Sequence, residues 1–311
     1  MTEQKEVALV VGASRGIGRQ VAIDLARSGF AGMVNLAVAA KSTSDASRAH
    51  PFPPDPNSSQ STVSTVGREI REAGGEALAI SVDVRNYASI ERMVSKVIEI
   101  YGRLDVVVYN SGAIWWSAVE TTSMKRFQLM QRVNPEGLYG TIQAALPHFK
   151  NNAWRGRIIV VSPPIYSRFF RGKTAYAMGK VGMSVLTKGL AMDFERQGRK
   201  DMAITSIWPA AAIDSAATKD PAIRQELRKP TIFSDAILAM LRAPASVVNG
   251  CLELDEDFLR QHTGMTDFSK YALISGTTPR RIMPVDFPDL RVAEQDDEGR
   301  RMDSVKTRAK I

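Results

Sequence analysis

The chain has 311 residues, of which 44% are hydrophobic and 24% charged, which is enough apolar material for one large α/β domain or two small ones. Its apolar runs are far shorter than a bilayer crossing requires, so we expect no membrane span. The net charge of +8 is dispersed, and no motif that reads DNA or RNA accompanies it, so we expect no nucleic-acid partner. A single cysteine, Cys251, excludes an internal disulfide and indicates a reducing compartment.

Short apolar runs alternate with amphipathic segments from residue 6 to about 210, which predicts parallel strands joined by helices on both faces of a sheet. The predicted strands are 7–11, 34–39, 77–82, 104–109, 157–161 and 203–207, with a last edge strand at 250–254. The predicted helices lie near 17–28, 63–73, 87–101, 123–149, 173–197, 216–228 and 233–242, the fourth kinked at Pro135. The expected fold class is therefore α/β, a Rossmann-type doubly wound parallel sheet in a single domain.

Two segments break this alternation. Residues 42–62 are rich in Ser, Pro, Asp and Asn and have no apolar period, which predicts a flexible surface loop inserted after the second strand. Residues 286–311 are highly charged, which predicts a flexible tail. We therefore expect one catalytic domain over 1–285, followed by this tail.

The first predicted strand runs into a glycine-rich turn and then a helix, the context that a dinucleotide pyrophosphate requires. Glycines permit the close backbone approach, and the helix N-terminus offers free N–H groups to the phosphates. At the end of the second strand Lys41 stands where an acid would favour NAD, and Arg15 lies in the turn, so both favour NADP(H); the alternative is that they are only surface charges. The predicted cofactor-binding residues of this turn are Gly12, Ser14, Arg15, Gly16, Ile17 and Gly18.

Further candidates follow the later strands, at the carboxyl edge where ligands bind in open α/β sheets. These are Asp83 and Val84 after the third strand, and Asn110 and Gly112 after the fourth. We assign no metal-binding residues. Farther along, Tyr176 and Lys180 are four residues apart and therefore share one face of a helix. A neighbouring ammonium stabilises a phenolate and brings its pKa toward the working range, which predicts general acid/base chemistry.

These motifs resemble the short-chain dehydrogenase/reductase family over residues 6 to about 255. The resemblance implies hydride transfer between NADP(H) and a carbonyl or alcohol, with Tyr176 as general acid/base and Lys180 orienting the ribose. It further implies that Asn134 holds a relay water, that Pro209, Ile213 and Ser215 meet the nicotinamide end, and that the protein is a homodimer or homotetramer. The matching pieces are GASRGIG at 12–18, VDV at 82–84, YNSGA at 109–113, VN at 133–134 and YAMGK at 176–180.

A closer resemblance is to the hydroxysteroid dehydrogenase-like subgroup of this family, without the sterol-carrier domain that its animal members append. It rests on SPP at 162–164, WPAAAIDSAA at 208–217, GCLELDEDFLRQ at 250–261 and DFSKYAL at 267–273. The subgroup includes peroxisomal members, and the last residues Ala309-Lys310-Ile311 fit the small-basic-aliphatic pattern of a peroxisomal address. We therefore expect a peroxisomal protein, with the cytoplasm as the alternative.

The chain departs from the family at Tyr109, which replaces the first Asn of the family's Asn-Asn-Ala-Gly turn, and at one catalytic position. The family places a carbonyl-binding Ser thirteen residues before the Tyr, and that position is Pro163, which has no side-chain donor. Losing such a donor typically costs about 3 kcal/mol of transition-state stabilisation. Ser162 takes its place if the loop is shifted. The alternatives are a cofactor-binding pseudoenzyme, or a non-redox isomerase or cyclase on a reductase scaffold.

Aromatic and basic residues follow the fourth and fifth predicted strands. They predict an apolar wall for a hydrophobic or acyl-type small-molecule substrate, while core packing or a dimer contact is the alternative. Arg168 and Arg171 are candidates for contacts with an acidic or CoA-bearing substrate, or are simply solvated. The aromatic residues are Trp115, Trp116, Tyr166, Phe169 and Phe170.

Overall fold

The computed structural model describes residues 5–28 and 35–289, and its strands form one seven-stranded parallel sheet. The strand order is β3-β2-β1-β4-β5-β6-β7, so the chain starts in the middle, builds one half outward, then returns beside β1 and builds the other half. This confirms the predicted fold class, including the short edge strand β7. The strands are β1 Val7–Val11, β2 Asn35–Ala40, β3 Glu76–Ser81, β4 Val106–Tyr109, β5 Gly156–Val161, β6 Met202–Trp208 and β7 Leu252–Leu254.

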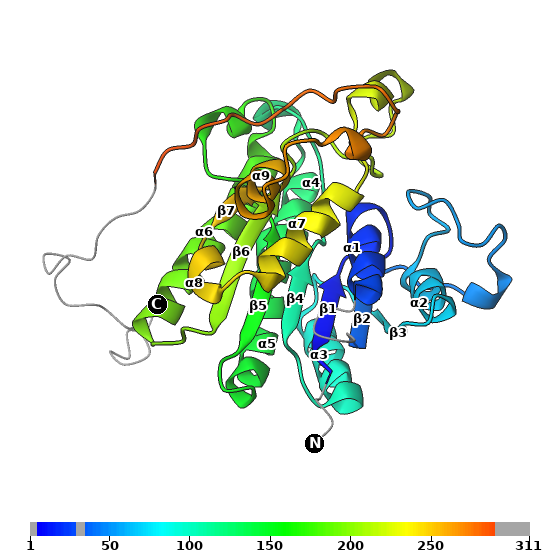
Figure 1. The fold of residues 1–311 in the computed structure, drawn as a ribbon, viewed down its shortest axis with the longest axis vertical. Coiled ribbons are helices and arrows are strands. Elements are labelled where there is room, and N and C mark those ends of the chain that lie inside the picture. The colour runs from blue at the N-terminus through cyan, green and yellow to red at the C-terminus, as the bar shows by residue number, and fades with distance from the viewer. Residues whose placement is uncertain (1–4, 29–34, 290–311) are drawn as a thin grey trace, which may run out of the picture.

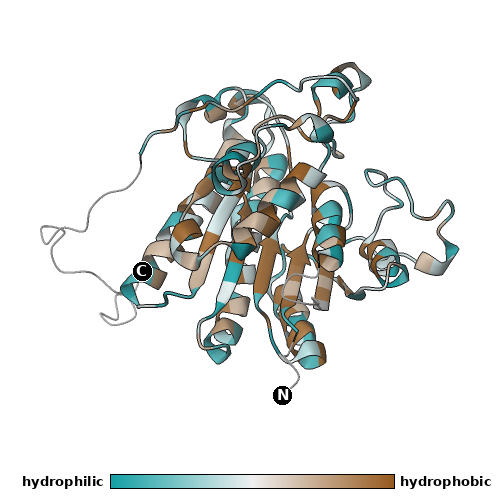
Figure 2. Cartoon of the chain, viewed as in Figure 1, coloured by the Kyte–Doolittle hydropathy of each residue, from teal (hydrophilic) through white to brown (hydrophobic). Residues whose placement is uncertain are grey.

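Helices cover both faces of the sheet because successive strand residues point to opposite sides and both sides are apolar. On one face α1, α2 and α7 pack over residues such as Val10 and Val38, and on the other α3, α5 and α6 pack over Leu9 and Val107. In Figure 1 α1 and α7 lie side by side in front of the sheet, and Figure 2 shows hydrophobic residues concentrated in the strands and hydrophilic ones at the periphery. The helices are α1 Gly16–Arg27, α2 Val63–Glu72, α3 Tyr87–Tyr101, α4 Met124–Gln131, α5 Gly137–Asn151, α6 Thr174–Arg196, α7 Thr231–Arg242, α8 Ala245–Val248 and α9 Asp255–Thr263.

Two predicted helices differ in detail from the observed ones. The helix expected over 123–149 is divided into α4 and α5 by a π-helical turn at Arg132–Glu136, which contains Pro135 and accounts for the predicted kink. The prediction of a helix near 216–228 is wrong, because only a short 3-10 helix forms at Pro221–Glu226. None of its residues is buried, so no packing supports an α-helix there.

The inserted segment 42–62 is connected to the glycine-rich turn. The Pro56 carbonyl accepts a hydrogen bond from the Gly16 amide at 3.0 Å, and the Ser61 hydroxyl donates to the Ser14 carbonyl at 2.6 Å. The segment contains a short 3-10 helix at Ala46–Arg48 and projects beside α2 in Figure 1. It is a surface loop, as predicted, and it supports the turn from outside; its flexibility stays a prediction.

Within residues 5–28 and 35–289 we find no helix with the length and hydrophobicity that a bilayer crossing requires. Most of the predicted tail, including Ala309-Lys310-Ile311, lies outside the described residues. The carboxyl ends of β1 and β4 lie next to each other, and between them the chain changes from building one half of the sheet to building the other. This switch point is where open α/β sheets bind ligands, so it positions the candidate site.

Candidate active site

The glycine-rich turn between β1 and α1 requires glycine at two positions. Gly12 has a φ of 89°, and a Cβ there would lie 2.5 Å from the Ser111 amide nitrogen. A Cβ on Gly18 would lie 2.3 Å from the Gly12 carbonyl oxygen. These glycines therefore allow the start of α1 to lie directly against the turn and against the loop after β4. The result is a helix N-terminus that faces the switch point, which suits an anionic phosphate.

A hollow of about 650 Å³ opens at this edge of the sheet. It extends from the glycine-rich turn, past the ends of β2 and β3, to α6 and the loop after β6. The structure brings most of the predicted site residues together around it. Those that line it are Gly12, Ser14, Arg15, Gly16, Ile17, Lys41, Asp83, Val84, Asn110, Gly112, Tyr176, Lys180, Pro209 and Ser215.

Four predicted residues lie outside this lining. Gly18 packs against the turn, and Ile213 is buried in the core on the α1 side of the sheet. Asn134 is fully buried behind the loop after β4, and Ser162 is fully buried behind the end of β5. Their positions are those of supporting residues rather than of residues that face the hollow.

Sequence reasoning missed several residues that line the hollow. Trp208 directly precedes Pro209, and Arg85 directly follows Val84. Their position next to a predicted site residue was the signal that could have identified them. Leu129 comes from α4 and Val133 from the π-turn; Val133 directly precedes Asn134, whereas no local pattern marks Leu129. They enter the site only because the helix after the fourth strand lies beside the switch point.

The charges at the β2 and β3 end of the hollow are arranged around Asp83. The Arg85 side chain donates two hydrogen bonds to this carboxylate, at 2.8 and 2.5 Å, and the Lys41 ammonium lies 3.7 Å from it. These contacts, the hydrogen bond from Arg85 foremost, hold the pKa of Asp83 well below its usual range. Arg15 donates a hydrogen bond to the Ser42 hydroxyl at 3.4 Å. This end of the hollow therefore combines one compensated acid with three cations, a suitable environment for an additional phosphate.

Tyr176 and Lys180 lie one turn apart on α6, and both are almost completely buried. The Lys180 ammonium donates a hydrogen bond to the Val161 carbonyl at 2.7 Å, and Trp208 offers it a ring face with the centroid at 5.5 Å. Burial lowers the pKa of Lys180 to about 7 and raises the pKa of Tyr176. The pair is thus desolvated, and its protonation responds strongly to any charge that enters the hollow.

The π-turn holds Asn134 in a fixed position. Its side-chain oxygen accepts from the Ala113 amide at 2.8 Å, and its side-chain nitrogen donates to the Ala113 carbonyl at 3.1 Å. The Tyr109 phenol donates to the Val133 carbonyl at 2.6 Å. A Cβ on Gly137 would lie 2.4 Å from that phenol oxygen, so Tyr109 and Gly137 fit together. Tyr109, a departure from the family pattern, therefore supports the turn that contains Asn134.

The segment after β5 does not present Ser162 to the hollow. The Ser184 hydroxyl lies 3.0 Å from the Ser162 hydroxyl and 2.6 Å from the Pro163 carbonyl. This contact links the end of β5 to α6, with Ser184 as the donor and the fully buried Ser162 oxygen as an acceptor. The described lining therefore contains no serine hydroxyl from this segment.

Aromatic rings surround Tyr176 on the side away from the glycine-rich turn. Its ring centroid lies 6.2 Å from that of Trp116 and 6.1 Å from that of Phe169, and Phe169 also packs edge-on against Trp208 at 5.7 Å. Tyr166 extends this group toward Phe169 at 6.2 Å. Three of the five predicted wall residues therefore gather on this side of the tyrosine, together with Trp208 from the end of β6. The other two do not join them, since Trp115 packs against Arg126 and Phe170 is exposed.

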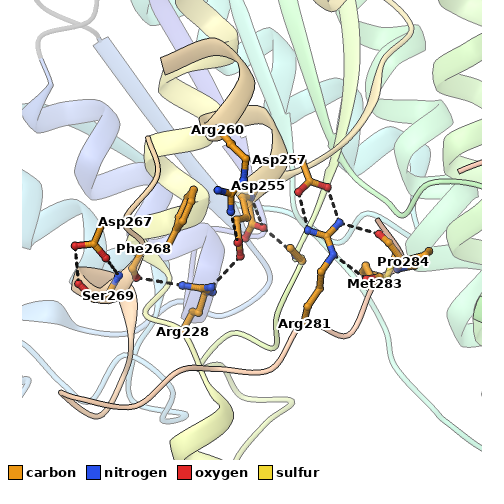
Figure 3. Close-up of polar contacts among 12 residues, drawn as sticks. Arg228, Asp255, Asp257, Arg260, Asp267, Phe268, Ser269, Arg281, Met283 and Pro284 are labelled. Carbon is orange, nitrogen blue, oxygen red and sulfur yellow. Dashed lines mark hydrogen bonds and ion pairs between the residues drawn. The ribbon is translucent and has the colours of Figure 1, made fainter. Parts of the chain in front are cut away.

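The C-terminal segment closes this side of the site. Phe287 packs edge-on against Tyr166 at 5.5 Å, and the Tyr166 phenol lies 3.3 Å from the Met283 sulfur. Figure 3 shows how the segment is fastened: Arg281 donates two hydrogen bonds of 2.6 Å to Asp257 on α9. Residues far from the rings in the sequence therefore complete the wall.

The turn after β6 is held from both sides. The buried Asp255 carboxylate accepts the Ala210 amide at 2.8 Å, and the Ala210 carbonyl accepts the Ile282 amide at 2.8 Å. Burial raises the pKa of Asp255 to about 7. A carboxyl group whose charged form is disfavoured by burial therefore lies behind Pro209, and its hydrogen bond to Ala210 fixes the turn that borders the hollow.

Comparison with known proteins identifies the family. A family model described as short chain dehydrogenase matches residues 56–222. Over 272 residues the chain is 34% identical to hydroxysteroid dehydrogenase-like protein 2 of Danio rerio, covering 86% of this chain and 60% of that protein. The chain thus spans about 60% of the length of this relative.

Solved structures agree with this result. A short chain dehydrogenase from Mycobacterium thermoresistibile is similar with a TM-score of 0.77 and 31% identity, covering 92% of this chain and 98% of the other. An alcohol dehydrogenase from the archaeon Thermococcus sibiricus, complexed with 5-hydroxy-NADP, is similar with a TM-score of 0.65 and 25% identity, covering 80% of this chain and 95% of the other. The predicted resemblance is confirmed, and the chain belongs to the short-chain dehydrogenase family.

Proposed function

We propose that the protein is an NADP(H)-dependent oxidoreductase that interconverts a carbonyl (or imine) and an alcohol (or amine) on a hydrophobic or acyl-type small molecule. The observation that supports this most directly is that Tyr176, Lys180 and the glycine-rich turn line the same hollow. The nicotinamide, when bound, supplies or accepts the hydride. The chain itself binds the nucleotide, excludes water from the reacting centre and transfers the proton.

In this proposal the Tyr176 phenol gives its proton to the substrate oxygen during reduction and takes it back during oxidation. The positive charge of Lys180 favours the phenolate, and both side chains are shielded from water. Asn134 holds the loop after β4 beside Lys180, since a Cβ on Gly112 would lie 3.5 Å from the Lys180 nitrogen and 3.7 Å from the Asn134 side-chain oxygen. In this proposal the proton then passes from the hollow past Lys180, which lines the same hollow as Tyr176.

Replacement of Tyr176 by Phe tests the assignment. Turnover with a panel of ketones and aldehydes should fall about a hundredfold or more, because general acid/base catalysis is lost while the ring packing remains. NADPH affinity, followed by the fluorescence of the nucleotide, should stay close to that of the unmodified protein. Tyr139→Phe is a matched control, since Tyr139 is exposed on α5. Unchanged turnover in Tyr176→Phe would reject the proposed role.

Cofactor preference is tested at Lys41 and Arg15. Since NADPH differs from NADH by one phosphate, Lys41→Ala or Arg15→Ala should weaken NADPH binding roughly tenfold and leave NADH binding nearly unchanged. The Thermococcus sibiricus relative is a complex with 5-hydroxy-NADP, which supports the same preference here. Equal losses for both nucleotides would contradict the assignment of a phosphate site.

Ser162 is proposed as the substitute for the family's Ser. In the structure its hydroxyl contacts Ser184 and not the hollow. Ser184 donates to the Ser162 oxygen, so the Ser162 proton stays available, but this fully buried hydroxyl must turn toward the hollow to reach a substrate oxygen. If it does, Ser162→Ala should lower kcat. If kcat does not change, Ser162 only fastens the end of β5 to α6, and the carbonyl is polarised by Tyr176 alone.

Pro163 favours a second candidate function, a cofactor-binding pseudoenzyme. It predicts tight NADPH binding without oxidation of NADPH by any carbonyl compound. A non-redox isomerase or cyclase would instead form product without net consumption of NADPH. Mass analysis of the reaction mixture beside the NADPH absorbance separates the three functions.

The proposal extends to assembly and location. Exposed apolar residues on α6, among them Val185 and Met192, suit a homodimer or homotetramer that packs through this helix. Sedimentation analysis tests this directly. The peroxisomal prediction rests on Ala309-Lys310-Ile311 and is tested by deleting these residues from a fluorescent fusion.

A further inference from the structure

The segment between β5 and α6 is rich in cations and contains no acid. Residues 163–175 include Arg168, Arg171 and Lys173, and neither Asp nor Glu. Within the part of the chain that the structure describes, none of these three cations forms an ion pair. The rim of the site beside the aromatic rings is therefore positively charged and uncompensated.

Lys173 differs from the two arginines in its surroundings. Arg168 and Arg171 are exposed, whereas Lys173 is half-buried at the start of α6, one turn before Tyr176. Its ammonium nitrogen lies 4.6 Å from the ring centroid of Phe169 and 5.9 Å from that of Trp116. The same two rings pack against Tyr176. The cation therefore lies beside the wall that surrounds the proposed reacting group.

The ammonium of Lys173 is only partly stabilised there. Burial lowers its pKa, and no carboxylate contributes an opposing effect. The two ring faces attract the cation, but they do not neutralise its charge. A partly desolvated cation without a counter-ion is a favourable site for an anion, because the anion replaces the water that the ammonium has lost. The neighbouring rings offer contact area to an apolar chain.

We propose that Lys173 forms an anion subsite that binds the carboxylate of an oxo acid, with the apolar chain of that acid lying along Trp116 and Phe169. The substrate class is then an amphipathic oxo carboxylic acid rather than an uncharged hydrophobic ketone. Arg168 and Arg171 raise the local concentration of such anions without fixing their position. This inference rests on the proposed function, because it assumes that the carbonyl reacts beside Tyr176.

The test compares oxo acids of increasing chain length with their methyl esters, which keep the carbonyl and lose the charge. With the unmodified protein and NADPH, kcat/KM should favour the acid over its ester by roughly tenfold to a hundredfold at the best chain length. Lys173→Met keeps the apolar stem against the rings and should bring that ratio close to one. Lys173→Arg keeps the charge and should retain a preference for the acid.

Lys200→Met is the matched control, since it removes the same charge from an exposed position before β6, at the opposite edge of the sheet. It should leave the ratio of acid to ester unchanged. The inference is overturned if Lys173→Met and the unmodified protein show the same ratio while both oxidise NADPH. In that case the proposed function stands and Lys173 only packs against the rings.

A failure of the proposed function gives a different result, with no NADPH oxidation by either member of any pair. Calorimetric binding of the acids to the protein in the presence of NADP⁺ then decides the inference. Binding that weakens at least tenfold in Lys173→Met and persists in Lys173→Arg supports the subsite. Equal binding to all variants, or none to any, overturns it.

Discussion

The two halves of the site are built by different means. On the β1 to β3 side the hollow is shaped mainly by backbone, with Gly12 and Gly18 allowing a close approach that no side chain permits. On the β5 to β7 side it is shaped by side chains, with Phe169, Trp208 and Phe287 arriving from three separate segments. The nucleotide side therefore depends on positions that tolerate one residue type. The substrate side depends on packing, which tolerates substitution.

This difference explains where the chain departs from its family. The glycine-rich turn matches the family pattern, whereas the catalytic Ser position contains Pro163 and the turn after β4 contains Tyr109. At Tyr109 the departure is compensated, since Gly137 makes room for the phenol and the Val133 carbonyl accepts its hydrogen bond. Where the backbone forms the binding surface, each position must keep its residue type. Where side chains form it, one side chain can change if its neighbours change with it.

The sharpest way to break this comparison is Gly18→Ala. The added Cβ would lie 2.3 Å from the Gly12 carbonyl, and that oxygen belongs to a turn fixed by two hydrogen bonds to Ala39. We expect a loss of about 3 kcal/mol in the free energy of unfolding, together with weaker nucleotide binding. Urea denaturation and nucleotide titration measure the two effects.

Gly182→Ala is the matched control within a helix. Its Cβ would make an ordinary contact of 3.6 Å with Pro135, so the variant should gain up to about 1 kcal/mol from helix propensity. If both substitutions change the free energy of unfolding by a similar amount, the close contact between α1 and the backbone of the turn does not require a glycine.

A smaller effect is expected for Tyr109→Phe. The substitution keeps the buried ring and removes the hydrogen bond from the phenol to the partly buried Val133 carbonyl, which costs about 1 kcal/mol. Because the same turn holds Asn134, kcat should fall as well, while the exposed Tyr139→Phe should change neither quantity. Full stability in Tyr109→Phe would mean that another group satisfies this carbonyl.

The smallest effect depends on pH and involves Asp255. Its pKa is raised by burial from an ordinary value near 3.8 to about 7, so the folded state binds its proton more tightly than the unfolded state. The stability that this group contributes is therefore lost as the pH rises from about 4 through about 7. Asp255→Asn keeps the acceptor for Ala210 and removes the charge, so it should gain stability over the unmodified protein only above this window.

Denaturation midpoints at about pH 5 and about pH 8 measure this difference. Asp267 provides the opposite control, shown with Asp255 in Figure 3, because hydrogen bonds from Ser269 lower its pKa. Its contribution is lost only as the pH falls below about 4, so Asp267→Asn should change stability by the same amount at pH 5 and at pH 8. A constant difference between Asp255→Asn and the unmodified protein at these two pH values would contradict the raised pKa of Asp255.

The sequence predicted the strands well because buried parallel strands are continuously apolar, and each predicted strand appears within a residue or two. It failed at 216–228, where only a short 3-10 helix without buried residues forms. Most residues that line the hollow were predictable, since they directly follow strands and therefore meet at one edge. Leu129 was not, because its place in the site depends on how α4 lies beside the sheet.

The sequence by itself determined the parallel sheet, the glycine-rich turn and the Tyr176–Lys180 pair, since each is encoded by neighbouring residues through hydrophobic period, backbone freedom or helical spacing. Only the tertiary structure decided that Ser162 faces Ser184 instead of the hollow, that Lys173 lies between two rings, and that Phe287 completes the wall. These outcomes depend on which distant segments pack together. Contacts between distant segments produce no repeating pattern of residues in a single sequence.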